Sequence, residues 1–148
     1  MRASWFLLSL FTSIAAHAQV GHDVTIVNSG STNTPGFTVV VHPGGRTTWS
    51  RAAGRGVAGA SAATHGSGAV APALAAKLSQ AIAAAGSLSS AQFAACAKSI
   101  SFGTRTSVDV AGDRTSDVSC VQSDPKLEAV RLAVRDVLAD SGTMAHVP

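Results

Sequence analysis

Residues 22–50 read HDVTIVNSGSTNTPGFTVVVHPGGRTTWS, and this stretch decides the fold class. Its alternating and β-branched residues predict three strands, over 22–28, 37–42 and 46–50. A polar segment, 28–36, separates the first two, and the tight turn Pro43-Gly44-Gly45 separates the last two. Both connections are rich in residues typical of turns. The stretch therefore predicts a three-stranded antiparallel meander.

The pattern changes after this meander. Residues 51–68 are rich in glycine and alanine without a period, which predicts a flexible loop or an extension of the hairpin away from the body of the domain. Pro72 and Gly86 delimit an alanine-leucine helix. A second helix is expected to begin at Asp124-Pro125 and to end near Ser141-Gly142.

Two more strands are expected between these helices, over 99–110 and 114–120. The predicted order is therefore βββ-α-ββ-α. Grouped strands indicate the α+β class. We expect an antiparallel sheet of about five strands with two helices on one face.

The first 18 residues have the pattern of a secretory signal peptide. A positive start at Met1-Arg2 precedes an apolar run from Trp5 to Ala16, and Ala16-His17-Ala18 supplies small residues before a cleavage site. As a helix, the run of about twelve residues would span about 18 Å, which is too short for a hydrocarbon core of about 30 Å. We therefore expect cleavage after Ala18, a secreted or periplasmic location, no membrane attachment after signal removal, and one small domain over 19–148.

Charge and composition exclude several classes of partner. The chain has 11 Lys and Arg against 8 Asp and Glu, a net charge of +3. The basic residues do not cluster, which argues against a nucleic-acid partner. The oligomeric state is not indicated.

Cys96 and Cys120 are the only cysteines. In an oxidising compartment they most simply form a disulfide, and two unpaired buried thiols are the alternative. The chain has no CxxC, and no histidine lies at ligand spacing from either cysteine. We therefore expect no metal site, and nothing in the sequence indicates another cofactor.

Catalytic patterns are weak. Glu128 is the only glutamate, and no G-x-S-x-G is present. A paired-carboxylate site or a nucleophile elbow is therefore not expected. We expect a protein that is not an enzyme, with a small hydrolase built on an unrecognised Ser/His pair as a remaining alternative.

Two features favour binding. The 28–37 segment is much longer than a two-residue hairpin turn, and long loops on a rigid sheet often carry recognition. Phe102 precedes Gly103, where a bend would turn its ring outward. An ordinary surface loop and a buried Phe102 are the corresponding structural alternatives. The candidate contact residues are Asn33, Thr34, Pro35, Gly36, Phe37 and Phe102.

The layout resembles the emfourin-type small inhibitors of thermolysin-like metalloproteases. The resemblance rests on a strand, a Ser-Gly-rich turn from Ser29-Gly30-Ser31 to Pro35-Gly36-Phe37, further strands, an Ala/Leu helix, a hairpin and a closing helix. In that family the turn is a compact Ser-Gly-Gly-Phe-Ala-Gly-like motif, whereas here five residues separate Gly30 from Gly36 and no Ala-Gly follows Phe37. The 51–68 segment and a disulfide are also additional.

Two other segments are similar to those of small uncharacterised secreted bacterial proteins. They are residues 28–34 (NSGSTNT) and the pattern Cys96-x-Lys98-Ser99-x-Ser101-Phe102-Gly103-Thr104. This second resemblance implies secretion and no activity.

Together these observations predict a secreted, non-catalytic binding module. One specific form is a protease inhibitor that acts through the 28–37 loop on a secreted protease or another extracellular protein. The alternative is a structural or cell-surface interaction protein.

Overall fold

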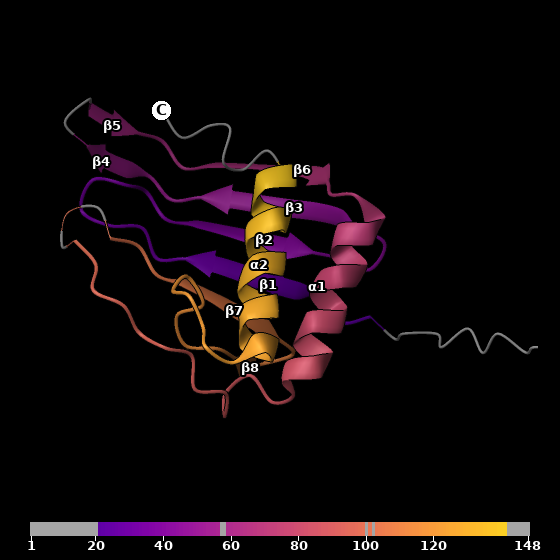
Figure 1. The fold of residues 1–148 in the computed structure, drawn as a ribbon. Helices are drawn as coiled ribbons and strands as arrows, with labels where there is room; N and C mark the ends of the chain where they lie inside the picture. Colours follow the sequence, from indigo (N-terminus) through magenta and orange to yellow (C-terminus); the bar gives the residue numbers. More distant parts are fainter. Residues whose placement is uncertain (1–20, 57–58, 100, 102, 142–148) are drawn as a thin grey trace, which may run out of the picture.

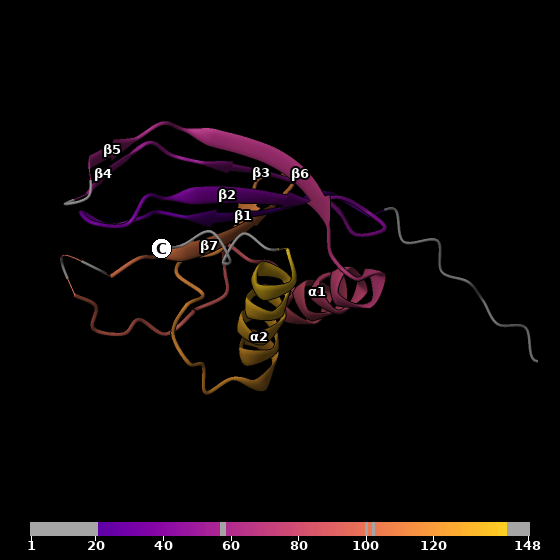
Figure 2. The same cartoon turned by 90° about the horizontal axis from the view of Figure 1, so that it is seen from above.

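A computed structural model describes residues 21–56, 59–99, 101, 103–141. The chain forms a six-stranded antiparallel sheet with the strand order β6-β3-β2-β1-β7-β8, and a separate two-stranded ribbon, β4-β5. Two helices lie on the same face of the sheet, so the α+β prediction is confirmed, with six strands in place of about five (Figures 1 and 2). The strands are β1 Val24–Asn28, β2 Phe37–Val41, β3 Arg46–Arg51, β4 Gly54–Gly56, β5 Gly59–Ser61, β6 Thr64–Ala69, β7 Thr106–Val110 and β8 Asp113–Arg114. The helices are α1 Pro72–Ala85 and α2 Pro125–Asp140.

The core lies between the sheet and the two helices. Side chains alternate along each strand, so one face of β1 places Val24 and Ile26 against the helices. In β2 the inward residues are Val39 and Val41, which are opposite them in the register. The other fully buried residues include Leu78 of α1, Val108 of β7, and Val130 and Val137 of α2.

The helix boundaries follow their capping residues. Pro72 lies in the first turn of α1, and Gly86 ends it with a φ of 79°. Asp124 caps α2, because its carboxylate accepts hydrogen bonds from the backbone N–H groups of Lys126 and Leu127. Both helices therefore begin and end where their local sequence predicted.

The described residues of 51–68 form an extension of the hairpin, which is the second of the two predicted alternatives, and not a flexible loop. They contain β4, β5 and most of β6, and the β4-β5 ribbon continues the hairpin of β3 and β6 beyond the neighbouring strands (Figure 1). The inward Gly66 of β6 is opposite Trp49 of β3, and a Cβ on Gly66 would lie 2.6 Å from the indole ring. Local propensity did not indicate these strands, because glycine and alanine are poor strand formers. Strand β6 forms by pairing with β3, and β4 and β5 form by pairing with each other.

The predicted strands over 99–110 and 114–120 are too long. Strand β7 begins only at Thr106, and β8 has only two residues. After β8 the chain stays beside β7, but side chains replace backbone acceptors. Thr115 Oγ1 accepts from the N–H of Val108 at 2.9 Å, and Asp117 Oδ1 accepts from the N–H of Thr106 at 3.0 Å. These side-chain hydrogen bonds take the place of backbone hydrogen bonds, so the regular β-ladder ends after β8.

Candidate binding site

The long connections of the sheet gather at one of its ends. The 29–36 loop, the β4-β5 ribbon and the segment that enters β7 all leave this end, which we call the loop end (Figure 1). The opposite end carries the short turns over 42–45 and 111–112. Recognition segments are usually long loops supported by a rigid sheet, so the loop end is the candidate binding site.

Two glycines form a narrow neck at the base of the 29–36 loop. Gly30 has a φ of 66°. A Cβ on Gly30 would lie 2.4 Å from the backbone N of Gly36, and a Cβ on Gly36 would lie 2.7 Å from the carbonyl O of Asn28. The backbone strands of the neck are therefore packed too closely for any side chain.

A tight turn forms the tip of the loop. The N–H of Ser31 donates to the carbonyl O of Thr34 at 2.8 Å. Between them, Thr32 and Asn33 are exposed. The tip therefore presents two polar side chains to solvent on a closed turn.

The side chain of Asn28 ties the base of the loop to the segment that enters β7. Its Oδ1 accepts from the N–H of Gly30 at 3.0 Å, and its Nδ2 donates to the Oγ1 atoms of Thr104 and Thr106, both at 3.1 Å. This single amide therefore closes the local turn and joins residues 76 and 78 positions apart.

Further hydrogen bonds extend the connection to the tip. The N–H of Ser29 donates to the carbonyl O of Arg105 at 2.8 Å, and Ser29 Oγ accepts from the N–H of Arg105 at 3.0 Å. The carbonyl O of Ser101 accepts from Ser31 Oγ at 3.0 Å and from the N–H of Asn33 at 3.3 Å. The loop is thus held along its length by a neighbouring segment.

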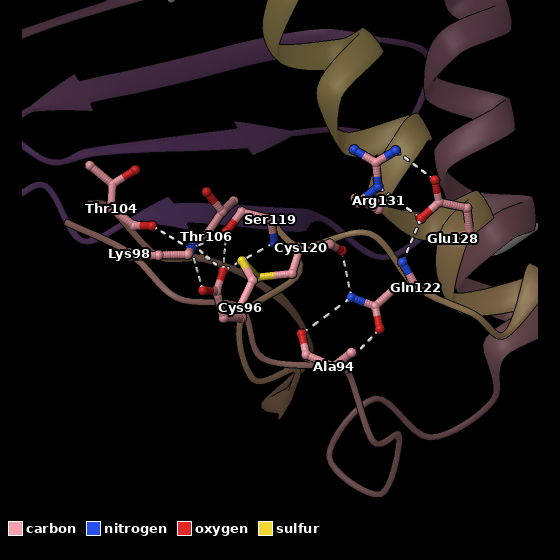
Figure 3. The surroundings of a disulfide bond; sticks show 11 residues. Ala94, Cys96, Lys98, Thr104, Thr106, Ser119, Cys120, Gln122, Glu128 and Arg131 are labelled. Carbon is pink, nitrogen blue, oxygen red and sulfur yellow. Dashed lines mark hydrogen bonds and ion pairs between the residues drawn. A yellow bond between two sulfur atoms is a disulfide. The ribbon is translucent and has the colours of Figure 1, made fainter. Parts of the chain in front are cut away.

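That neighbouring segment is itself held by Lys98 (Figure 3). Its Nζ donates to the carbonyl O of Thr104 at 2.6 Å, and also to the Asp117 carboxylate and Ser119 Oγ. The Lys98 and Asp117 side chains are 20% and 17% exposed, so this ion pair is largely shielded from water.

The pKa of Asp117 reflects this setting. Partial burial raises the pKa, but hydrogen bonds from Lys98, Ser119 and the N–H of Thr106 outweigh that effect and lower it from 3.8 to about 2. The folded-state pKa is below the unfolded value, so the ionised carboxylate stabilises the fold above about pH 4.

We expect this stabilisation to be lost as the pH falls from about 4 to about 2, by up to about 2 kcal/mol. The measurement is urea unfolding at several pH values for the wild type and Asp117→Asn. The variant should be less stable at neutral pH and should show a flatter acid limb. Asp109→Asn on β7 is the control, and an acid limb of Asp117→Asn identical to that of the wild type would contradict the assignment.

A disulfide between Cys96 and Cys120 fixes the start of the segment, as the sequence predicted, with 5.7 Å between the Cα atoms. Gln122 extends this junction, because its Nε2 donates to the carbonyl O of Cys120 at 2.6 Å and its Oε1 accepts from the N–H of Ala94 at 2.7 Å (Figure 3). The start of the segment is therefore joined to residues 120–122 by a covalent bond and a side-chain bridge.

The same junction is tied to the first turns of α2. The Glu128 carboxylate accepts from the N–H of Gln122 at 2.9 Å and from the Arg131 guanidinium at 2.8 and 2.5 Å. The hydrogen bond from Arg131, then that from Gln122, lowers the pKa of Glu128 to about 2. The segment beside the loop is thus connected to the helix layer.

The structure distributes the sequence-predicted contact residues over different environments. Asn33 is exposed at the tip, whereas Gly36 belongs to the neck. Thr34 and Pro35 are half-buried. Phe37 begins β2 and packs against the core, so its ring does not extend from the loop. Phe102 lies outside the described residues.

Four residues that shape this site are absent from the predicted contact residues. Asn28 and Thr32 lie within the predicted 28–37 segment, whereas Ser101 and Arg105 lie outside it. Asn28 stands before a Ser-Gly pair, which is a typical signal for a side-chain turn. Its contacts with Thr104 and Thr106 had no local signal, because they depend on the pairing of β1 with β7.

A cavity of about 320 Å³ lies behind the loop. It is bordered by Thr34 and Phe37 on the loop side and by Arg131, Arg135 and Leu138 of α2. It differs from the exposed tip, because its walls come from the sheet, the helix and the segment entering β7.

A histidine–carboxylate pair lies at the opposite end of the sheet. His42 Nδ1 is 3.0 Å from Asp23 Oδ1. His42 and Ser79 both border a second cavity, of about 250 Å³. The Oγ of Ser79 donates a hydrogen bond to the carbonyl O of Ala75 at 3.1 Å. Because the hydroxyl proton of Ser79 is donated to the helix backbone and not to His42, this arrangement does not favour Ser79 as a nucleophile activated by His42.

Within the described ranges, no three His, Cys, Asp or Glu side chains are grouped as metal ligands. In the same part of the chain, neither helix combines the length and hydropathy needed to cross a bilayer.

Comparison with known proteins returns no matching family model, no matching curated protein and no matching solved structure.

Proposed function

We propose that the protein is an exported, non-catalytic binding module that contacts another protein through the tip of the 29–36 loop. The observation that carries this proposal is the preformed loop. Its neck is closed by Gly30 and Gly36, and its length is hydrogen-bonded to the segment entering β7. At its tip, the side chains of Thr32 and Asn33 are exposed and make no hydrogen bond to another described residue. A loop ordered before binding loses little conformational entropy in the complex.

Protease inhibition is the specific form that we propose. Inhibitors of this kind bind as preorganised loops whose backbone changes little in the complex. The disulfide and the side-chain bridge of Gln122 hold the start of the segment to which the loop is hydrogen-bonded, which suits an environment rich in proteases. The resemblance of the layout to emfourin-type inhibitors supports the same form.

Export is proposed from the pattern of residues 1–18 together with the disulfide. Disulfides persist in secreted and periplasmic proteins and are rare in the cytosol.

The test measures the hydrolysis of a fluorogenic peptide by thermolysin-like and subtilisin-like proteases in the presence of the mature protein. We expect slow, saturable inhibition of at least one protease. The double variant Thr32→Ala/Asn33→Ala should weaken inhibition at least tenfold without changing the melting temperature. The matched control is Thr48→Ala/Ser50→Ala, which alters two exposed polar residues of β3. Inhibition that is unchanged by the tip variant would refute the site, and absence of inhibition across the panel would refute this form of the function.

The alternative of a structural or cell-surface protein is favoured by the uncovered face of the sheet (Figure 2). This face carries small hydroxyl side chains in register, with Thr38 and Ser50 in one row and Thr25, Thr48 and Ser67 in the next. The control variant Thr48→Ala/Ser50→Ala lies on this face. If it loses attachment to the cell surface while the tip variant keeps that attachment, the structural role is supported instead of inhibition.

A further inference from the structure

The cavity behind the loop has a chemical character of its own. Its walls come from the ends of β1, β2 and β7 with the residues next to them, from the 118–119 segment and from α2. Its volume of about 320 Å³ lies at the lower end of the range typical of small-molecule sites. The lining residues that the structure describes are Asn28, Thr34, Phe37, Thr104, Thr106, Val118, Ser119, Arg131, Val134, Arg135 and Leu138.

Apolar side chains form one part of this lining. Val118, Val134 and Leu138 are buried, with 1%, 3% and 7% of their surface exposed. Phe37 is half-buried and packs against the same core. These side chains would cover the apolar body of a ligand and remove it from water.

The polar part of the lining offers mainly donors. Arg131 and Arg135 are both present, and no Asp or Glu is found among the lining residues that the structure describes. Each guanidinium uses Nε and Nη2 for a neighbouring carboxylate, Glu128 for Arg131 and Asp136 for Arg135. Nη1 of each arginine makes no hydrogen bond in the described part of the chain, so each arginine keeps a donor for a further acceptor.

Two threonine hydroxyls add to these donors. The Oγ1 atoms of Thr104 and Thr106 each accept from Asn28 Nδ2 at 3.1 Å. Their own O–H protons have no acceptor within the described residues. A hydroxyl that accepts from an amide is polarised toward donating its proton to the next group. The polar part of the lining is therefore complementary to a group that only accepts hydrogen bonds, such as an ionised carboxylate.

We infer that this cavity binds a small carboxylic acid with an apolar body, such as an aryl- or alkyl-alkanoate. The carboxylate would accept from Arg135, Arg131 and the threonine hydroxyls, while the apolar body would contact Phe37, Val134 and Leu138. Charge-assisted hydrogen bonds to a guanidinium are stronger than neutral ones, so the ionised acid should bind better than its neutral analogue. This inference does not depend on binding of a protease by the loop tip.

Isothermal titration calorimetry with three probes tests the two halves of the site separately. 3-Phenylpropionate carries both the carboxylate and the apolar body, 3-phenylpropionamide lacks the charge, and acetate lacks the body. We expect 3-phenylpropionate to bind at least tenfold more tightly than either of the others, with affinity that falls as the salt concentration rises. Equal binding of the acid and the amide, or no heat from the acid at millimolar concentration, would overturn the inference.

Arg135→Gln locates the site. Arg135 is 61% exposed, so this substitution should leave the melting temperature close to that of the wild type. We expect it to weaken 3-phenylpropionate binding about tenfold and Arg135→Lys to restore part of the loss. The matched control is Arg46→Gln. Arg46 is an exposed arginine that begins β3, at the end of the sheet away from the cavity. Equal affinities of the Arg135→Gln and Arg46→Gln variants would show that the acid binds elsewhere.

Discussion

Gly30→Ala is expected to open the neck of the 29–36 loop and to abolish binding through its tip. The new Cβ would lie 2.4 Å from the backbone N of Gly36 and 2.6 Å from the carbonyl O of Thr34. Both contacts are backbone atoms of the same closed turn, so neither can move away as a side chain would. The φ of 66° adds the cost of a left-handed conformation for alanine. We expect a loss of about 3 kcal/mol in the free energy of unfolding and of all detectable inhibition.

Gly44→Ala is the matched control, because Gly44 also has a positive φ, of 85°, and nothing lies within 4 Å of its Cβ position. This variant should lose only about 1 kcal/mol and should bind normally. Urea unfolding and the protease assay measure both effects. Equal destabilisation by the two substitutions would show that the backbone conformation, rather than the closed neck, accounts for the whole cost.

Removal of the disulfide is the second large change. The double variant Cys96→Ser/Cys120→Ser opens a loop with a sequence separation of 24. The chain-entropy relation gives a loss of about 3.5 kcal/mol. The loss should be larger than for an exposed crosslink, because Cys120 is 3% exposed and a serine there places a hydroxyl in the core. Chemical denaturation under oxidising conditions measures the change.

Reduced wild type separates the crosslink from the packing. It keeps the sulfur atom of Cys120 in place while losing the covalent bond, so it should be more stable than the double variant and less stable than the oxidised protein. The double variant should not respond to reductant. A wild type whose denaturation midpoint is the same before and after complete reduction would show that the crosslink contributes nothing to stability.

The central strands and both helices could be predicted from short stretches of the chain. Alternation over 22–50 placed β1, β2 and β3, because each strand buries one face and exposes the other. Asp124-Pro125 placed the start of α2 and Gly86 the end of α1, because capping depends on neighbours only a few residues away. The 28–37 loop was recognisable for the same reason, since turn residues act locally.

The edge strand and the return after β7 could not be predicted in this way. Strand β6 consists mainly of small residues and forms because β3 provides a partner and Trp49 needs space over Gly66. The residues after β8 contain Thr115 and Asp117, whose side chains take the place of backbone acceptors. Neither effect has a period or a local propensity.

By itself, the sequence determined the fold class, the helix ends, the pairing of its two cysteines and the position of the long loop. Only the tertiary structure decided that this loop is closed and held. The amide of Asn28 reaches hydroxyls 76 and 78 positions away, and Lys98 joins Thr104 to Asp117 across the neighbouring segment. The cavity beside Arg135 likewise exists only once the sheet and α2 are packed. The physical reason is the range of the forces: caps and turns act over a few residues, whereas these contacts require strands and helices to be assembled first.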